Sequence, residues 1–165
     1  DGYWLLGGDG GVFTFGSSRF FGSTGATKLN QPVVGMSATP SGKGYWLVAR
    51  DGGIFTFGDA GFFGSTGAIR LNEPIVDVAP TRSGRGYWLL ARDGGVFAFG
   101  DAQWLGSVPG TGACGAVESV SIGASRSGLG YVVAGTDGRT WSFGDAPRVD
   151  AQSRGGIVDF AMLPG

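Results

Sequence analysis

Histidine is absent from this sequence of 165 residues, and cysteine occurs once, as Cys114. Histidine is the commonest general base and metal ligand in proteins. Its absence excludes Ser-His-Asp and Cys-His catalytic arrangements and every histidine-based zinc site. A single cysteine cannot form a disulfide within the chain. With no histidine to activate it, we expect Cys114 to be a small buried or half-buried residue.

Charge is also scarce. The chain has 12 Lys and Arg against 13 Asp and Glu, a net charge of −1, and no basic run. Nucleic acids and anionic membrane surfaces attract cationic surfaces, so we expect neither as a partner. No apolar run approaches the roughly 20 residues that span a bilayer, so we expect no membrane insertion. Asp1 is not an initiator Met and lies inside a repeat, so we expect the chain to be excised from a longer protein.

Glycine, in contrast, is abundant, with 35 residues, and it marks a repeated unit. Gly-Tyr-Trp occurs three times and returns once as Gly-Tyr-Val. The tyrosines of these motifs, 42, 42 and 44 residues apart, are Tyr3, Tyr45, Tyr87 and Tyr131. A second motif follows each one, as FTFG at 13–16 and 55–58, FAFG at 97–100 and WSFG at 141–144. Four units of this length are typical of propeller blades or solenoid coils.

Each unit contains four short candidate strands, best seen in the copy at 44–85. Residues 45–49 and 54–57 are apolar, aromatic or β-branched and flank Asp-Gly-Gly, which predicts a hairpin. We expect Phe62-Phe63 to form an outer strand, and 75–79 to be the innermost strand of the following unit. No run of ten residues has helical periodicity. Antiparallel four-stranded units predict an all-β fold, a β-propeller. The runner-up is a β-solenoid, whose coils are usually shorter and parallel.

The sequence begins and ends in the middle of a repeated unit. Residues 156–162 match the innermost strand at 74–79 but precede no Gly-Tyr-Trp strand, whereas the first Gly-Tyr-Trp strand has no innermost strand before it. We therefore predict one domain over 1–165, a monomeric four-bladed ring closed by pairing the N- and C-terminal strands, which removes an exposed edge. The alternatives are that the chain is part of a larger propeller or that two chains share a larger ring. The predicted blades are 1–28 with 156–165, 32–70, 74–112 and 116–155.

Aspartate recurs at two turns of the unit. A tight hairpin turn requires Asp-Gly, which accounts for Asp9, Asp51, Asp93 and Asp137. In the Gly-Asp-Ala turns we expect the carboxylate to accept a hydrogen bond from the backbone two residues on; these are Asp59, Asp101 and Asp145. The alternating oxygen ligands of a calcium loop are missing, so we expect no metal and no cofactor. Ser-Gly-Lys-Gly at 41–44 resembles half a phosphate loop, but its counterparts at 83–86 and 127–130 identify it as a turn between strands.

Carboxylates are the remaining catalytic candidates, because a pair of them can hydrolyse a glycosidic bond. The candidates are Glu73, Asp77, Glu118 and Asp159. Asp77 and Asp159 occupy matching positions on predicted innermost strands, which line the central channel of a propeller. We expect these two side chains to form hydrogen bonds at the channel mouth, with cation or water binding as the alternative. We therefore expect no enzymatic activity.

Tryptophan occurs in two settings. Trp4, Trp46 and Trp88 repeat inside predicted strands, so we expect them in the core between blades. Trp104 takes the place of Phe62 or Phe63 on a predicted outer strand, where exposure is expected, and an exposed aromatic beside polar groups is typical of sugar sites. Repeated polar residues on the loops between blades complete the candidate ligand-binding set. It consists of Trp104, Ser23, Thr24, Asn30, Ser65, Thr66 and Asn72. The alternative is that these loops are only connectors.

The pattern GYWLVARDGGIFTFGDAGFFGSTGAIRLNEPIV resembles a tandem repeat of secreted actinobacterial proteins, where it often accompanies hydrolase, peptidase or other extracellular domains. The resemblance covers units one to three. Unit four departs from it, because Val132 replaces Trp, Pro-Arg-Val at 147–149 replaces Phe-Phe, and Ser-Thr-Gly is missing. The resemblance implies an extracellular or cell-wall-associated accessory propeller without catalytic activity, and it carries over no ligand or site residue.

These observations predict a non-catalytic binding or interaction module. Its expected partner is a glycan or cell-wall polymer, bound through the loop rim and exposed aromatics. The alternative is a structural or protein-interaction scaffold beside a catalytic domain, and a carboxylate-based glycoside hydrolase is a remote third. The near-identity of units one to three also fits a designed or consensus origin.

Overall fold

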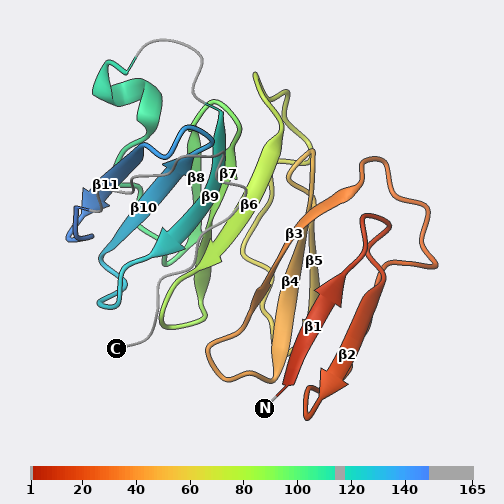
Figure 1. Ribbon diagram of the computed structural model, residues 1–165. Helices are drawn as coiled ribbons and strands as arrows, with labels where there is room; N and C mark the ends of the chain where they lie inside the picture. The colour runs from red at the N-terminus through yellow and green to blue at the C-terminus, as the bar shows by residue number, and fades with distance from the viewer. Residues whose placement is uncertain (1, 114–117, 149–165) are drawn as a thin grey trace.

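The chain folds into β-sheets with almost no helix. The computed structural model describes residues 2–113 and 118–148, which form eleven strands and one short 3₁₀ helix, η1 (Val108–Thr111). The strands assemble into four antiparallel sheets that follow one another in chain order (Figure 1). Over these residues, no helix has the length and apolarity that crossing a membrane would take. The all-β prediction is confirmed.

Each sheet corresponds to one repeated unit, and its central strand begins at the Gly-Tyr motif. The first sheet pairs β1 (Gly2–Leu6) with β2 (Val12–Gly16). The second contains β3 (Val33–Ala38), β4 (Gly44–Ala49) and β5 (Ile54–Gly58). The third contains β6 (Ile75–Pro80), β7 (Gly86–Ala91) and β8 (Val96–Gly100). The fourth contains β9 (Ser119–Ala124), β10 (Gly130–Gly135) and β11 (Thr140–Gly144). The predicted hairpins and innermost strands within these ranges are confirmed.

The turn between β4 and β5 shows why every hairpin carries Asp-Gly. Gly52 has φ +78°, a conformation that glycine adopts without steric cost. Asp51 stabilises the turn, because its Oδ1 accepts a hydrogen bond of 2.9 Å from the Gly53 N–H. The other three hairpins repeat this geometry, so the prediction for these turns is confirmed.

Neighbouring sheets pack face to face through the central strands. Tyr45 and Leu47 of β4 point toward the preceding sheet, where they pack with Trp4 and Val12. Alternate side chains point the other way, and Trp46 joins the cluster formed with the third sheet. We call the side of a sheet that faces the preceding unit its upstream face, and the opposite side its downstream face. Because neighbouring sheets cover both of their faces, β4 and β7 are buried along their whole lengths. The residues of β10 are buried as well.

The prediction of a fourth, outer strand in units one to three is wrong. Residues 19–22, 61–64 and 103–106, which we call the outer segments, pair with no strand. Buried aromatic side chains hydrogen-bond their backbone instead. The Trp46 Nε1–H donates to the Gly61 carbonyl over 2.7 Å. The hydroxyl of Tyr87, on the following sheet, accepts from the Phe63 N–H over 3.2 Å and donates to the Gly64 carbonyl over 2.5 Å. A further ladder of strand pairing is therefore not required.

The same three hydrogen bonds hold the outer segments of units one and three. In unit one the donors and acceptors come from Trp4 and Tyr45, and in unit three from Trp88 and Tyr131. Gly-Tyr-Trp is therefore a structural motif, in which Trp fixes the outer segment of its own unit and Tyr fixes that of the preceding unit. The expectation that the three tryptophans belong to the core between sheets is confirmed for Trp46 and Trp88, which are fully buried; Trp4 is half-buried.

Unit four reaches the same result with different residues. Val132 stands in the tryptophan position and lies opposite Ser142 on β11. The Ser142 hydroxyl donates to the Pro147 carbonyl over 2.7 Å, and Pro147 is the counterpart of Gly61 and Gln103. A cross-strand serine thus replaces the indole N–H. The rest of the predicted outer strand of this unit, the closing strand at 156–162 and Cys114 lie outside the described residues.

The innermost strands come together on one side of the row of sheets. β6 contacts β3 on one side and β9 on the other, so successive units meet both through their faces and through their inner edges. At the ends of the same strands, the Asp-Gly turns and the loops that connect the units form one rim, and the Thr/Ser-x-Ser-Gly turns at 39–42, 81–84 and 125–128 form the opposite one. The first rim carries the candidate site.

Candidate ligand-binding site

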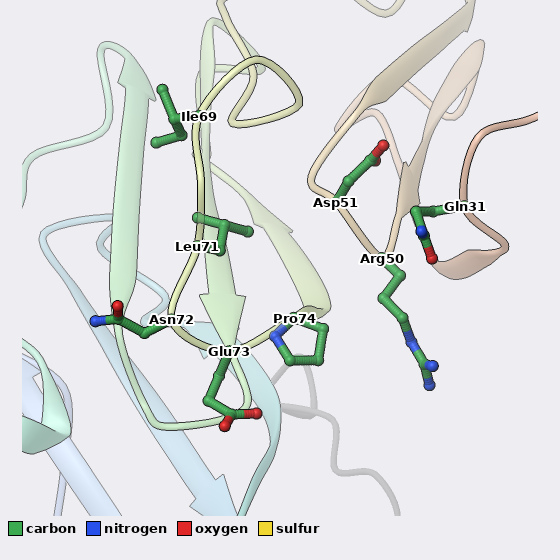
Figure 2. Close-up of a pocket in the computed structure, with 8 residues that line it drawn as sticks. All are labelled: Gln31, Arg50, Asp51, Ile69, Leu71, Asn72, Glu73 and Pro74. Carbon is green, nitrogen blue, oxygen red and sulfur yellow. The ribbon is translucent and has the colours of Figure 1, made fainter.

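Two hollows of matching composition lie between an Asp-Gly turn and the loop that leads to the next sheet. The first has a volume of about 250 Å³ and the second about 280 Å³. Figure 2 shows the second, with Ile69, Leu71, Asn72 and Glu73 along the loop on one side and Gln31, Arg50 and Asp51 on the other. Seven residues of the first hollow have counterparts in the second, and they are Gly8, Asp9, Thr27, Leu29, Asn30, Gln31 and Pro32.

The two hollows are adjacent. Gln31 lines both, because it stands at the end of the first loop and beside the second Asp-Gly turn. Each hollow is built mainly from one unit's turn and loop, with Gln31 of the first loop added to the second hollow, so the repeat of the chain creates a repeat of the site. The rim therefore presents consecutive, nearly equivalent hollows.

Each hollow combines polar groups with an apolar leucine. Leu29 and Leu71 are half-buried and pack against the hydrophobic clusters between the sheets, so the core fixes their positions. Asn30 and Asn72 are exposed beside them, and an amide side chain both donates and accepts hydrogen bonds. The turn aspartates Asp9 and Asp51 are fixed by their hydrogen bonds to the backbone two residues on. Such an arrangement can bind a small neutral molecule that has both hydroxyl groups and an apolar face.

Thr24 and Thr66, predicted as ligand-binding residues, are buried, with 3% and 1% of their surfaces exposed. Each lies against the glycine of an Asp-Gly turn. Thr66 Oγ1 donates to the Asp51 carbonyl over 3.1 Å, and a Cβ placed on Gly52 would lie 1.7 Å from this oxygen. These hydroxyls therefore do not face solvent. The threonines anchor the loop against the turn and in this way position the hollow.

The other predicted ligand-binding residues divide into three groups. Asn30 and Asn72 line the hollows. Ser23 and Ser65 are half-buried and line neither. Trp104 is 62% exposed on the outer segment of unit three, with its Nε1–H donating to the Val96 carbonyl over 3.1 Å. It occupies the same position as the exposed Phe20 and Phe62. Trp104 therefore lines neither hollow.

Asp77 ties two innermost strands together. Its Oδ1 accepts a hydrogen bond from the Val78 N–H, and its Oδ2 accepts from the Ser121 hydroxyl and the Ile122 N–H of β9, each over 2.8 Å. Three donors on one carboxylate fit a cross-link between β6 and β9. Asp77 therefore accepts hydrogen bonds within and between innermost strands. Its predicted place at a channel mouth stays a prediction, and its partner in that prediction, Asp159, lies outside the described residues.

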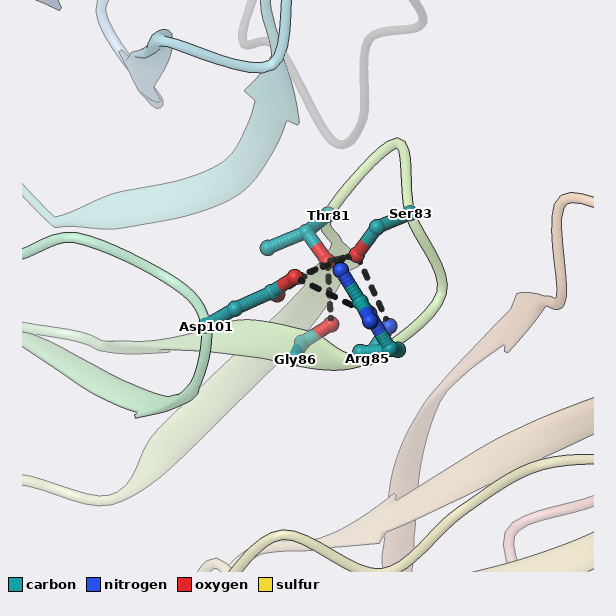
Figure 3. Close-up of polar contacts among 5 residues, drawn as sticks. All are labelled: Thr81, Ser83, Arg85, Gly86 and Asp101. Carbon is teal, nitrogen blue, oxygen red and sulfur yellow. Dashed lines mark hydrogen bonds and ion pairs between the residues drawn. The ribbon is translucent and has the colours of Figure 1, made fainter.

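The aspartates of the Gly-Asp-Ala turns do not accept the expected backbone hydrogen bond two residues on. They accept from two hydroxyls of the turn that precedes the central strand. In Figure 3, Asp101 is bonded to the Thr81 and Ser83 hydroxyls, with Arg85 Nε 3.7 Å away. These bonds, that from Ser83 above all, lower the pKa of Asp101 from its ordinary value of 3.8.

The same network recurs around Asp59, where Ser41 and Thr39 donate, and around Asp145, where Ser127 and Ser125 donate. These donors lower the pKa of both carboxyls as well. A carboxylate with a lowered pKa beside a serine can indicate a reactive site. Here the carboxylate accepts a hydrogen bond from the serine hydroxyl at the same position of three turns, so we interpret the network as one that closes the turn.

Sequence reasoning placed only the two asparagines of the hollows in the ligand-binding set. The residues that it left out include the two leucines, Gln31 and Arg50. One signal was available, since Leu-Asn-x-Pro recurs at 29–32 and 71–74, which marks the leucine together with the asparagine. Over 2–113 and 118–148, no cluster of acidic, cysteine or histidine side chains is arranged to hold a metal ion. Comparison with protein-family models finds no match for the chain, and comparison with curated proteins finds none either.

Proposed function

We propose that this protein is a non-catalytic binding module, extracellular or associated with the cell wall, that binds a glycan or cell-wall polymer through the loop rim. The extracellular location rests on the resemblance of its repeat to those of secreted proteins. The observation that supports binding is the pair of adjacent hollows of nearly equal volume that share Gln31.

A polymer of repeating sugars suits this rim better than a single small molecule. Each hollow is shallow and supplies few contacts, so we expect its affinity for one sugar to be low. Two adjacent sites on one rigid scaffold act together on a chain with matching repeats. Linked sites of this kind strengthen binding by roughly 10²–10⁴-fold over one site. The neutral amides and the near-zero net charge of the chain fit a neutral or weakly charged polymer.

The proposal is tested by co-sedimentation with insoluble cell walls and with plain polysaccharides, followed by release with soluble sugar. Asn30→Ala and Asn72→Ala each remove a polar group from one hollow, so each is expected to weaken retention. The double variant is expected to lose roughly tenfold or more beyond either single variant, because neither hollow then keeps its asparagine.

Leu129→Ala is the matched control. Leu129 is exposed on the turn before β10, at the opposite end of the strands from the Asp-Gly turns. Its substitution is expected to leave retention unchanged. Retention that is equal in the control and the double asparagine variant would rule out the rim as the binding site, and no retention on any polymer would rule out the glycan proposal.

The sheets also support an architectural proposal, that they are blades of a β-propeller. The support is the face-to-face packing of successive units and the contacts among β3, β6 and β9. The pairing of 156–165 with the first unit, which would close a four-bladed ring, lies outside the described residues and stays a prediction.

A further inference from the structure

The first sheet differs from the other three in having an exposed upstream face. Tyr3 is 56% exposed, whereas its counterparts Tyr45, Tyr87 and Tyr131 are fully buried. Leu5, Phe13 and Phe15 of the same face are also exposed. An apolar face of this size on one sheet marks an interaction surface.

The other three upstream faces show what such a face binds. Each packs on the downstream face of another repeated unit, and each tyrosine ring meets a tryptophan of that unit, as Trp46 meets Tyr87 at 5.9 Å between ring centroids. The tyrosine hydroxyl then bonds one N–H and one carbonyl of that unit's outer segment. The interface is therefore the same three times within one molecule. The upstream face of the first sheet has the same four residue types as those of the second and third sheets, namely Tyr, Leu, Phe and Phe.

The inner edge of the first sheet also indicates, independently of its face, that this sheet binds another unit. Over the described ranges, β1 pairs only with β2, whereas β4, β7 and β10 each pair with an innermost strand as well. An innermost strand and a downstream face lie together in one sequence stretch, represented by residues 44–85. One further unit therefore satisfies both the face and the edge.

We propose that the upstream face of β1–β2 binds a further repeated unit of this same type, supplied from outside the present sequence. The required unit has a tryptophan at the position of Trp46, an outer segment like 61–64, and an innermost strand that pairs with β1. This inference rests on the proposed propeller architecture. Of the alternatives given by the sequence, it adopts the one in which the chain is part of a larger propeller, and not the one in which the ring closes within this chain.

The fourth sheet of this chain is a poor occupant for that face. Its downstream face has Val132 in the position where the tyrosine of the next unit would meet a tryptophan ring.

Tyrosine nitration mapped by peptide mass spectrometry tests the proposal. Two proteins are compared, the present chain and an extended chain in which a copy of residues 44–85 precedes Gly2. We expect Tyr3 to be nitrated in the present chain and protected in the extended one. The tyrosine of the added copy is then the exposed one and serves as the internal positive control. A chain extended by the same 42 residues in scrambled order is the matched negative control.

Stability measurements on Tyr3→Phe give a second readout. We expect this substitution to leave the denaturation midpoint unchanged in the present chain and to lower it in the extended chain. Nitration of Tyr3 to the same extent in both chains would overturn the proposal.

The remaining outcomes name other occupants and also overturn it. Protection of Tyr3 in a present chain with the solution mass of one copy would show closure within the chain. Protection that appears only with the mass of two copies would show a second copy on this face. Polysaccharide retention, measured on the same proteins, reports the rim separately, so the failure of one proposal is distinguishable from the failure of the other.

Discussion

The hydroxyl of Tyr87 is the most direct test of how the outer segments are held. Tyr87→Phe removes only this oxygen and keeps the ring that packs in the cluster between the second and third sheets. The oxygen makes two hydrogen bonds, from the Phe63 N–H and to the Gly64 carbonyl. A hydrogen bond contributes about 1 kcal/mol net, and an unpaired buried group costs at least as much. We therefore expect the free energy of unfolding to fall by about 2 kcal/mol.

The assay is equilibrium denaturation, supported by thermal unfolding. For a chain of this size, 2 kcal/mol corresponds to a fall in Tm of about 4–8 °C. Tyr3→Phe is the control, because the Tyr3 side chain is exposed; we expect the free energy of unfolding to change by no more than about 0.5 kcal/mol. A loss below 0.5 kcal/mol for Tyr87→Phe would refute the view that the tyrosine hydroxyl holds the outer segment.

Two further predictions concern turns. Gly42→Ala and Gly52→Ala both force alanine to a positive φ, but nothing lies within 4 Å of the added Cβ at Gly42, whereas Thr66 Oγ1 lies 1.7 Å from it at Gly52. We expect the free energy of unfolding to fall by about 1–2 kcal/mol for Gly42→Ala and by more for Gly52→Ala. Equal losses in equilibrium denaturation would contradict the anchoring role of Thr66. The lowered pKa of Asp101 stabilises the folded state above pH 3.8, and this stabilisation is lost as the pH falls through the folded-state pKa. We expect Ser83→Ala to raise the pKa of Asp101 and so to reduce this stabilisation. Carboxyl titration by NMR checks this, and an unchanged pKa would show that the serine is not the main cause.

The sequence was sufficient to predict the strands that form the backbone ladders. The innermost strand and the hairpin are encoded by short apolar runs separated by Asp-Gly, and both signals are local. The outer segment carried a similar apolar pair, Phe62-Phe63, which predicted a strand. Its actual hydrogen-bond partners are Trp46 and Tyr87, one of them on another sheet. Pairing of this kind depends on packing between units, so no local pattern reveals it.

The candidate site shows a similar limit. A threonine in a polar loop has the same sequence context whether it faces solvent or lies under a turn. The third unit distinguishes the two cases. Val108 occupies the position of Thr24 and Thr66 there, and it is also buried against a turn glycine. An apolar residue at that position indicates an interior role. The asparagines, in contrast, are exposed and line the hollows, and their role in ligand binding stays a prediction.

The direction of the tyrosine bonds has a consequence for synthesis. Each outer segment is fastened by the tyrosine of the unit that comes after it in the chain. A ribosome adding 5–20 residues per second needs roughly 2–8 s for one more unit. During that interval the most recently synthesised outer segment lacks its hydrogen bonds to a tyrosine hydroxyl, whereas the earlier outer segments already have theirs. We therefore expect the protein to fold from the N-terminus during synthesis, with only the outer segment of the most recently completed unit not yet hydrogen-bonded.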